Sequence, residues 1–175
     1  NKNTYGEWKI RSSFALDWQV NYQDLKFQLS LKNTKHTGIF PEQALNWEKI
    51  KAISNADTKF LNLFGYSGAS SLAAVSKGAE VVHVDSSKTA LTWAHENLTM
   101  NSFSGCKLVA EDALHFMDRE IKRRHTYSII QMDPPAWGIG TKGKKWQLEN
   151  QLDSLLQNAS TLLTENGILI LSTYS

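Results

Sequence analysis

Two short motifs contain the residues in this sequence that could do chemistry. The first is an apolar run that ends in Phe64-Gly65-Tyr66-Ser67-Gly68, with an acid downstream at Asp85. The second is an apolar run that ends in Asp133-Pro134-Pro135-Ala136-Trp137. A glycine turn lets the backbone approach a ligand closely, while an acid beside an aromatic ring can hold and stack a base. The motifs therefore indicate a nucleoside-containing cofactor with a second substrate beside it.

The glycine turn follows a predicted strand and opens a predicted helix. The free N–H groups and partial positive charge of a helix N-terminus suit a phosphate, or a carboxylate such as that of S-adenosyl-L-methionine. The turn lacks the full Gly-x-Gly-x-x-Gly pattern of NAD enzymes, so by itself it is a weak signal.

Acids follow the next two predicted strands. Asp85 is placed to accept hydrogen bonds from ribose hydroxyls; the alternative is helix capping together with Ser86 and Ser87. Asp112 could accept a hydrogen bond from an exocyclic amino group such as that of adenine. Helix capping is again the alternative, and Glu111 could exchange roles with Asp112.

The Asp-Pro-Pro segment is a candidate acceptor site. Its prolines fix φ and make a stiff turn at the carboxyl edge of the sheet, where ligands bind in open α/β folds. Asp133 could accept a hydrogen bond from the substrate or from the ammonium group of a methyl donor. Trp137 could stack on an unpaired base, or be the buried residue of a rigid connector. Lysines follow that could contact phosphate or simply be solvated: Lys142, Lys144 and Lys145.

Between these motifs the sequence alternates between short apolar runs and amphipathic stretches. The pattern predicts strands at 60–64, 80–84, 107–109, 128–132 and 167–172, and helices at 44–54, 69–76, 88–101, 113–124 and 146–163. Alternating strand and helix predicts a Rossmann-like, doubly wound α/β domain with a mostly parallel sheet. Such sheets usually contain further strands, so we expect the C-terminal strands to be missing from this chain.

The N-terminal part follows a different pattern. Residues from about 5 to 32 are typical of strands and turns, and Leu25–Leu31 alternates apolar and polar residues. We therefore predict a small β-rich appendage at 1–36 and a main domain at 37–175.

Composition excludes several classes of site. Cys106 is the only cysteine and the five histidines are scattered, so we expect no disulfide and no structural metal. A net charge of +2 neither requires nor forbids nucleic acid. No apolar run is long enough to cross a membrane and no signal peptide is evident, so we expect a cytoplasmic protein.

In combination, these motifs resemble class I S-adenosylmethionine-dependent methyltransferases. Thr37–Gln43 is also similar to the Thr-Gly-x-Phe-x-x-Gln segment of the branch that contains the 23S ribosomal RNA cytosine-5 methyltransferases. The resemblance implies an RNA substrate and the cofactor S-adenosyl-L-methionine. The implied cofactor contacts are Gln43, Phe64, Gly65, Tyr66, Ser67, Gly68, Asp85, Ser86, Asp112 and Ala113.

One departure changes the expected chemistry. Enzymes of that branch carry a catalytic cysteine after the fifth strand, where this sequence reads Ser172-Thr173-Tyr174. Cys106 lies elsewhere and is typical of a small buried apolar residue. Asp-Pro-Pro-aromatic is also similar to the motif of methyltransferases that modify exocyclic amino groups without a covalent intermediate. We therefore expect direct transfer, with Asp133, Pro134 and Pro135 holding the acceptor.

Three other functions remain open. An NAD-type oxidoreductase would use a similar fold, although the incomplete glycine motif argues against it. A nucleic-acid-binding protein could keep the fold without catalysis, and loss of the cysteine favours that alternative. A methyltransferase acting on a small molecule is the third, because the fold does not fix the substrate.

Overall fold

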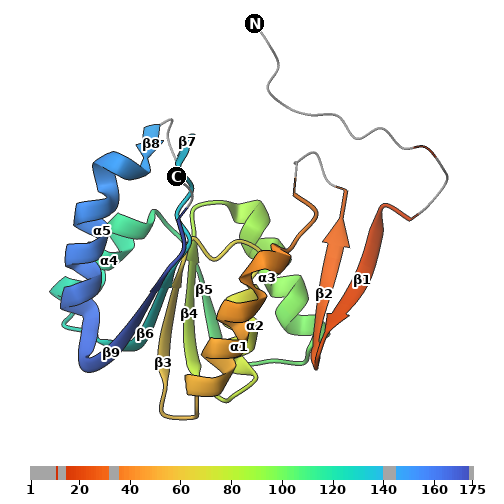
Figure 1. The fold of residues 1–175 in the computed structure, drawn as a ribbon, viewed down its shortest axis with the longest axis horizontal. Helices are drawn as coiled ribbons and strands as arrows, with labels where there is room; N and C mark the ends of the chain where they lie inside the picture. Colours follow the sequence, from red (N-terminus) through yellow and green to blue (C-terminus); the bar gives the residue numbers. More distant parts are fainter. Residues whose placement is uncertain (1–10, 12–14, 32–35, 140–144, 174–175) are drawn as a thin grey trace, which may run out of the picture.

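The computed structural model describes residues 11, 15–31, 36–139 and 145–173. Its central layer is a five-stranded parallel sheet in the order β5-β4-β3-β6-β9 (Figure 1). The strands are β3 (Lys59–Leu63), β4 (Glu80–Asp85), β5 (Cys106–Ala110), β6 (Tyr127–Met132) and β9 (Leu163–Leu171). This confirms the predicted doubly wound α/β class.

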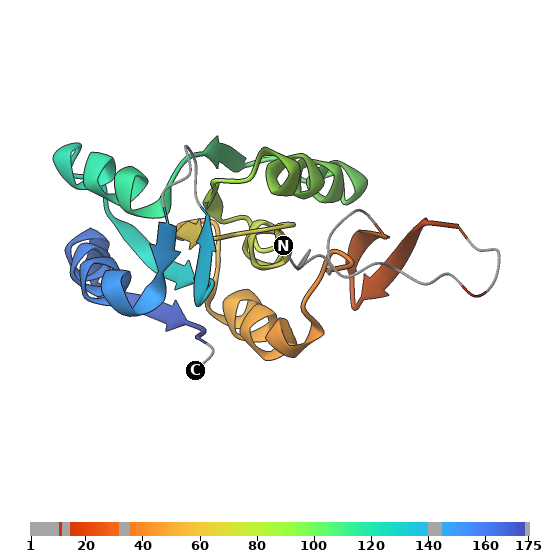
Figure 2. The same cartoon turned by 90° about the horizontal axis from the view of Figure 1, so that it is seen from above.

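Helices cover both faces of the sheet (Figure 2). One layer is formed by α1 (Ala44–Ile53), which begins after the short 3-10 helix η1 (Pro41–Gln43), together with α2 (Ala69–Val75) and α3 (Lys88–Met100). The opposite layer is formed by α4 (Ala113–Lys122) and α5 (Leu148–Leu162).

Each face of the sheet has its own apolar core, because successive side chains of a strand point to opposite faces. In β3, Phe60 packs with residues of α1 and α2, whereas Leu61 and Leu63 pack with residues of α4 and α5. Burial on both faces explains why these strands are short, nearly continuous apolar runs.

The direction of winding reverses between β3 and β6. From β3 the chain winds outward through β4 to β5, and then returns to the other side of β3 to form β6 and β9. Neighbouring crossovers therefore leave from opposite faces at this point and open a crevice at the carboxyl ends of β3 and β6, where ligands bind in such folds. Both chemical motifs of the sequence lie here.

The N-terminal appendage is an antiparallel hairpin of β1 (Asp17–Tyr22) and β2 (Leu25–Ser30). The side chain of Asn101 in α3 binds both the N–H and the carbonyl of Lys26, at 2.8 and 2.7 Å. Leu25 and Phe27 are fully buried in the same apolar core as α1 and α2. The hairpin is therefore part of the packing of the main domain.

Several predicted boundaries differ from the structure: β9 begins at Leu163 and not at residue 167, and α4 ends at Lys122 and not at residue 124. The last predicted helix starts at Leu148 and not at Trp146, because the chain first forms a small antiparallel hairpin of β7 (Trp137–Ile139) and β8 (Lys145–Gln147). The N–H of Leu148 donates to the carbonyl of Ala136 at 2.9 Å and ties the helix to the base of this hairpin. Three-residue strands are too short to show an apolar period in the sequence.

Candidate active site at the carboxyl edge of the sheet

The turn after β3 has an unusual backbone. Phe64 and Tyr66 have positive φ values of 58° and 49°, and Gly68, at the start of α2, has a φ of 90°. Non-glycine residues with positive φ are uncommon and concentrate at functional sites. At Gly65 a Cβ atom would lie 2.3 Å from the ring of His83, so only glycine fits there. This close packing holds the turn against β4.

Asp85 fixes the same turn from the end of β4. Its Oδ2 accepts a hydrogen bond from the N–H of Tyr66 at 2.9 Å, and its Oδ1 accepts one from the N–H of Ser87 at 2.8 Å. The N-cap of α3 is Ser87, which leaves Asp85 outside the helix. Burial raises the pKa of Asp85 above its usual value. Each carboxylate oxygen can accept one further hydrogen bond from a ligand.

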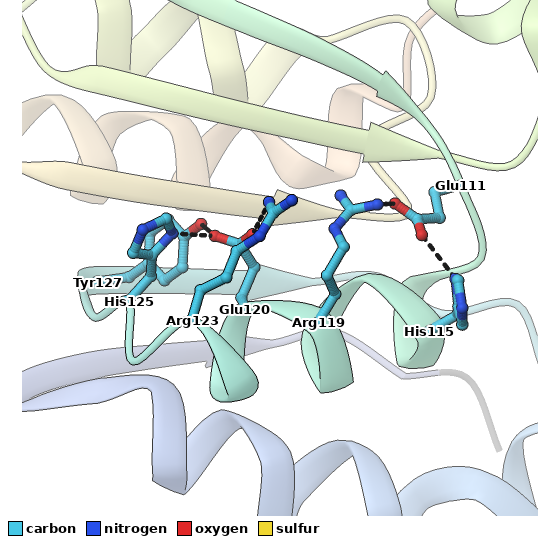
Figure 3. A network of polar contacts seen from close by, with 7 residues as sticks. All are labelled: Glu111, His115, Arg119, Glu120, Arg123, His125 and Tyr127. Carbon is cyan, nitrogen blue, oxygen red and sulfur yellow. Dashed lines mark hydrogen bonds and ion pairs between the residues drawn. The ribbon is translucent and has the colours of Figure 1, made fainter.

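Asp112 caps α4, as the alternative interpretation of the sequence expected. Its Oδ1 accepts a hydrogen bond from the N–H of His115 at 3.1 Å, and the residue also lines a cavity. The neighbouring carboxylate of Glu111 contacts His115 Nδ1 and an Arg119 guanidinium nitrogen, each at 2.6 Å (Figure 3). The ion pair with Arg119 holds Glu111 in place and balances its charge, so the geometry favours Asp112 over Glu111 for contact with a ligand.

Two adjoining cavities open at this edge of the sheet. The larger, of about 800 Å³, lies beside β4, β5 and the β7–β8 hairpin; the smaller, of about 400 Å³, lies beside the glycine turn and η1. Asp112, Ala113 and Lys145 line the larger cavity. Gln43, Gly65, Tyr66, Ser67, Asp133 and Pro134 line the smaller one. The residues common to both are Phe64, Asp85, Ser86 and Pro135.

The aromatic side chains of Phe40 and Tyr66 line the smaller cavity. The ring of Tyr66 lies 5.4 Å from that of Phe40 and 5.8 Å from that of Trp93. Burial, and secondarily the charge of Asp85, raises the pKa of Tyr66 to about 12, so its hydroxyl remains a donor. That buried hydroxyl has no hydrogen-bond partner among the described residues. A ligand with a polar group could supply one.

Ser67 has a structural side chain. It is 2% exposed, and its hydroxyl donates to the carbonyl of Gly38. Its own carbonyl accepts a hydrogen bond from the Asn97 side chain at 2.9 Å. The glycine turn is therefore attached both to α3 and to the Thr37–Gln43 segment.

Asp133 follows β6 and faces the smaller cavity. Burial, reinforced by the negative charge of Glu42, raises the pKa of Asp133 to about 6. Its Oδ2 lies 3.4 Å from Nε2 of Gln43. A carboxylate in this setting is largely ionised at neutral pH and can accept a hydrogen bond from an amino group of a substrate.

The β7–β8 hairpin lies beside the Asp-Pro-Pro turn after β6. Trp137 is 75% exposed, so its interpretation as a buried connector residue is wrong. Trp146, which the motif analysis did not identify, donates from Nε1 to the carbonyl of Pro135 at 2.7 Å, and its ring lies 5.2 Å from that of Phe64. Lys142 and Lys144 lie outside the described residues, as does Tyr174.

Cys106 is unsuited to act as a nucleophile at this site. It is the first residue of β5, at the opposite end of the strand from the cavities, and burial raises the pKa of its thiol to about 12. Within the described part of the chain, no cluster of His, Cys, Asp or Glu could hold a metal ion. No helix in that part is long and apolar enough to span a membrane.

The arrangement suits one elongated ligand and one acceptor. A nucleoside would fit beside Asp85 and Asp112 in the larger cavity, and a charged tail beside the glycine turn in the smaller cavity. The reacting group would then lie near the residues common to both cavities, close to Asp133. Asn62 and Gln131 also line the smaller cavity, and the sequence motifs gave no signal for either.

A family model and several known proteins match most of this chain. The model of a family described as conserved hypothetical protein 95 matches residues 32–175. The ribosomal RNA large subunit methyltransferase K/L of Syntrophotalea carbinolica is 35% identical over 160 residues, which are 89% of this chain and 22% of that protein. Its counterpart in Methylococcus capsulatus is 31% identical over 85% of this chain and 20% of its own length. The chain thus spans about a fifth of these relatives.

A solved structure covers nearly the whole fold. The crystal structure of the SAM-dependent methyltransferase from Agrobacterium tumefaciens matches with a TM-score of 0.92 and 38% sequence identity. The match covers 99% of this chain and 58% of that one. The arrangement of sheet, helices and N-terminal hairpin is therefore shared with a protein of that description.

Proposed function

This chain belongs to the conserved hypothetical protein 95 family, and on that premise we propose that it is an S-adenosylmethionine-dependent methyltransferase acting on ribosomal RNA. The observation that carries the proposal is the pair of cavities that meet at Phe64, Asp85 and Pro135. One cavity has the groups to hold a nucleoside, and the other has the glycine turn and an acid for the acceptor. An RNA substrate implies a cytoplasmic location.

The cofactor contacts follow from the geometry of the turn. Asp85 has free acceptor capacity for ribose hydroxyls while its bonds to the backbone hold the turn in place. Asp112 and the adjacent Ala113 lie where an adenine ring would enter the larger cavity. Contacts to the rest of the cofactor are expected from Phe64, Gly65, Tyr66, Ser67 and Ser86, which line the smaller cavity, and from Gly68 at the start of α2. The backbone of Ser67 is the expected contact, because its hydroxyl is already bonded to Gly38.

When bound, S-adenosylmethionine supplies a methyl group on a positively charged sulfur. The protein contributes position and electrostatics. Asp133 accepts a hydrogen bond from the acceptor amino group. This contact directs the lone pair of the amino nitrogen toward the junction of the cavities. Pro134 and Pro135 fix the turn that carries this carboxylate, and Trp146 holds the carbonyl of Pro135. The cysteine on β5 is far from this position, so transfer is direct.

RNA binding rests on the β7–β8 hairpin. The exposed ring of Trp137 offers a stacking face, and Lys145, on the neighbouring strand, offers a positive charge for a phosphate. We include Lys142 and Lys144 in this proposal on their sequence position alone. A target base within a helix must be flipped out to reach Asp133.

The test is transfer of a labelled methyl group from S-adenosylmethionine to deproteinised large-subunit ribosomal RNA, followed by mass spectrometry of the nucleosides. We expect one modified nucleotide, with incorporation reduced about 10²-fold in Asp133→Ala, which removes the acceptor contact. Small-subunit ribosomal RNA is the control substrate. If the protein binds the cofactor but methylates no RNA, the RNA part of the proposal fails and a small-molecule acceptor takes its place.

A further inference from the structure

The side-chain amide of Gln43 is held in one orientation. Gln43 is 8% exposed, and its Oε1 accepts hydrogen bonds from Nδ2 of Asn46 at 2.7 Å and from the hydroxyl of Ser172 at 3.2 Å. Because both donors occupy the oxygen, the amide nitrogen must face the other way. In that direction lies Oδ2 of Asp133, at 3.4 Å from Nε2.

The groups that orient Gln43 come from separate elements. Asn46 lies in the first turn of α1 and also donates to the Ser172 hydroxyl at 3.2 Å, which closes a ring of three side chains. Ser172 follows β9, and its N–H donates to the carbonyl of Met132 at 3.0 Å, directly before Asp133. The ring therefore ties the start of α1 to the ends of β6 and β9.

We propose that Gln43 is a positioning residue that directs the Asp133 carboxylate toward the acceptor. The inference rests on the proposed function and deepens it, because the sequence indicated only a cofactor contact for Gln43. A distance of 3.4 Å is long for a hydrogen bond, and such contacts commonly tighten when substrate is bound. The ring of side chains already fixes the Gln43 amide, so little conformational entropy is lost when its hydrogen bond to Asp133 shortens.

A neutral donor suits this position. Among the described residues, the charged and titratable groups near Asp133 are Glu42 on η1, His36 ahead of it, and Asp85 and Tyr66, which line the same smaller cavity. Glu42 opposes ionisation of Asp133, whereas an amide N–H favours the ionised form. A lysine or arginine would neutralise the carboxylate and compete with the substrate amino group. Gln43 orients one oxygen and leaves the other available to the acceptor.

The test compares three variants of the whole chain. Gln43→Leu removes the donor at similar volume. Ser172→Ala removes one of the two groups that fix the amide. Gln157→Leu makes the same chemical change on the exposed face of α5 and is the matched control. For each we would measure S-adenosylmethionine affinity by calorimetry, kcat on large-subunit ribosomal RNA, and the pKa of Asp133 by carbon NMR, assigned with Asp133→Asn.

We expect Gln43→Leu to lower kcat roughly tenfold and to raise the pKa of Asp133, with cofactor affinity unchanged within about twofold. Ser172→Ala should shift both quantities in the same direction by a smaller factor, and Gln157→Leu should change neither. An unchanged pKa of Asp133 in a folded Gln43→Leu protein would overturn the proposal. So would a loss of cofactor affinity at constant kcat, which would make Gln43 a cofactor ligand.

These measurements distinguish loss of the positioning role from loss of the proposed function. If the wild-type protein does not bind S-adenosylmethionine, the proposed function falls, and the NMR titration alone then decides whether Gln43 controls Asp133. If wild-type activity is present and Gln43→Leu retains all of it, the positioning role falls and the proposed function stands. Should Gln43→Leu fail to fold, a Ser172→Ala protein with unchanged kcat and unchanged pKa would contradict the proposal.

Discussion

Asp133, the proposed acceptor contact, illustrates how a residue placed for function can cost stability. Its folded-state pKa is raised to about 6 from an ordinary value of 3.8, because the carboxyl group is partly buried beside Glu42. The protonated form is therefore favoured by folding. The stabilising contribution is complete below about pH 4 and is lost as the pH rises through about 6. At neutral pH the charged carboxylate is a net cost.

We therefore predict that Asp133→Asn raises the melting temperature at pH 7.5 and leaves it nearly unchanged at pH 4. After allowance for partial exposure to solvent, the gain at pH 7.5 should be roughly 1 kcal/mol. Thermal unfolding at the two pH values measures it. Equal changes at both pH values would show that the ionisation of Asp133 is not responsible.

A substitution at Gly65 tests the close packing of the glycine turn. An added Cβ would lie 2.3 Å from the ring of the fully buried His83, whose Nδ1 is hydrogen-bonded to Ser71 at 2.9 Å. Gly65→Ala should therefore destabilise the protein by about 1–3 kcal/mol. Gly138→Ala is the control, because nothing lies within 4 Å of a Cβ built there. Chemical denaturation that found both variants equally stable would refute this account of the turn.

At the scale of elements, Asn97 couples the N-terminal hairpin to the glycine turn. It is fully buried in α3; its Oδ1 accepts from the N–H of Gln28 at 2.8 Å, and its Nδ2 donates to the carbonyl of Ser67 at 2.9 Å. Loss of the amide leaves two backbone groups without a partner. Asn97→Ala should cost about 2–4 kcal/mol of stability and weaken cofactor binding as well.

Asn101→Ala separates the effect on stability from the effect on cofactor binding. Asn101 binds the backbone of Lys26 in the same hairpin, whereas the bond from α3 to the glycine turn comes from Asn97. We expect it to lower stability while leaving cofactor affinity unchanged within about twofold. Denaturation and calorimetry on both variants provide the comparison. Parallel losses of affinity would mean that hairpin docking in general, and not Asn97, controls the turn.

The β7–β8 hairpin is the element expected to contact RNA. Because Trp137 is 75% exposed, Trp137→Ala should change the free energy of unfolding by no more than about 0.5 kcal/mol. The same change should weaken RNA binding by about 1–3 kcal/mol if a base stacks on the ring. Fluorescence anisotropy with large-subunit ribosomal RNA fragments measures the affinity. Unchanged affinity would remove Trp137 from the acceptor site.

The elements that the sequence predicted well are those buried on both faces of the sheet. The strand predicted from Ser128 to Met132 agrees with β6 within one residue, because near-continuous apolar runs arise from two-sided burial. The sequence pattern does not predict the β7–β8 hairpin, since Trp146 also fits the start of an amphipathic helix. Contacts such as Gln43 with Asp133 join residues 90 positions apart, and no local pattern encodes them.

At the scale of the whole molecule, the winding of the chain determines where the site can form. The sheet order puts β3 and β6 side by side although β4 and β5 lie between them in sequence. The glycine turn after β3 and the Asp-Pro-Pro turn after β6 therefore meet at one edge (Figure 1). This explains why two motifs that are far apart in the sequence can contribute to one candidate site. The matches to known methyltransferases confirm the resemblance to the class I enzymes.

The most direct measurement is isothermal titration calorimetry of S-adenosylmethionine into the protein, with Asp85→Ala as the control. Asp85 supports both the turn and the expected ribose contact, so the variant should lose most of the affinity. We predict micromolar binding by the wild-type chain, about 8 kcal/mol, and no measurable binding by the variant. Absence of binding by the folded wild-type protein would contradict the assignment of the two cavities to a methyl donor and its acceptor.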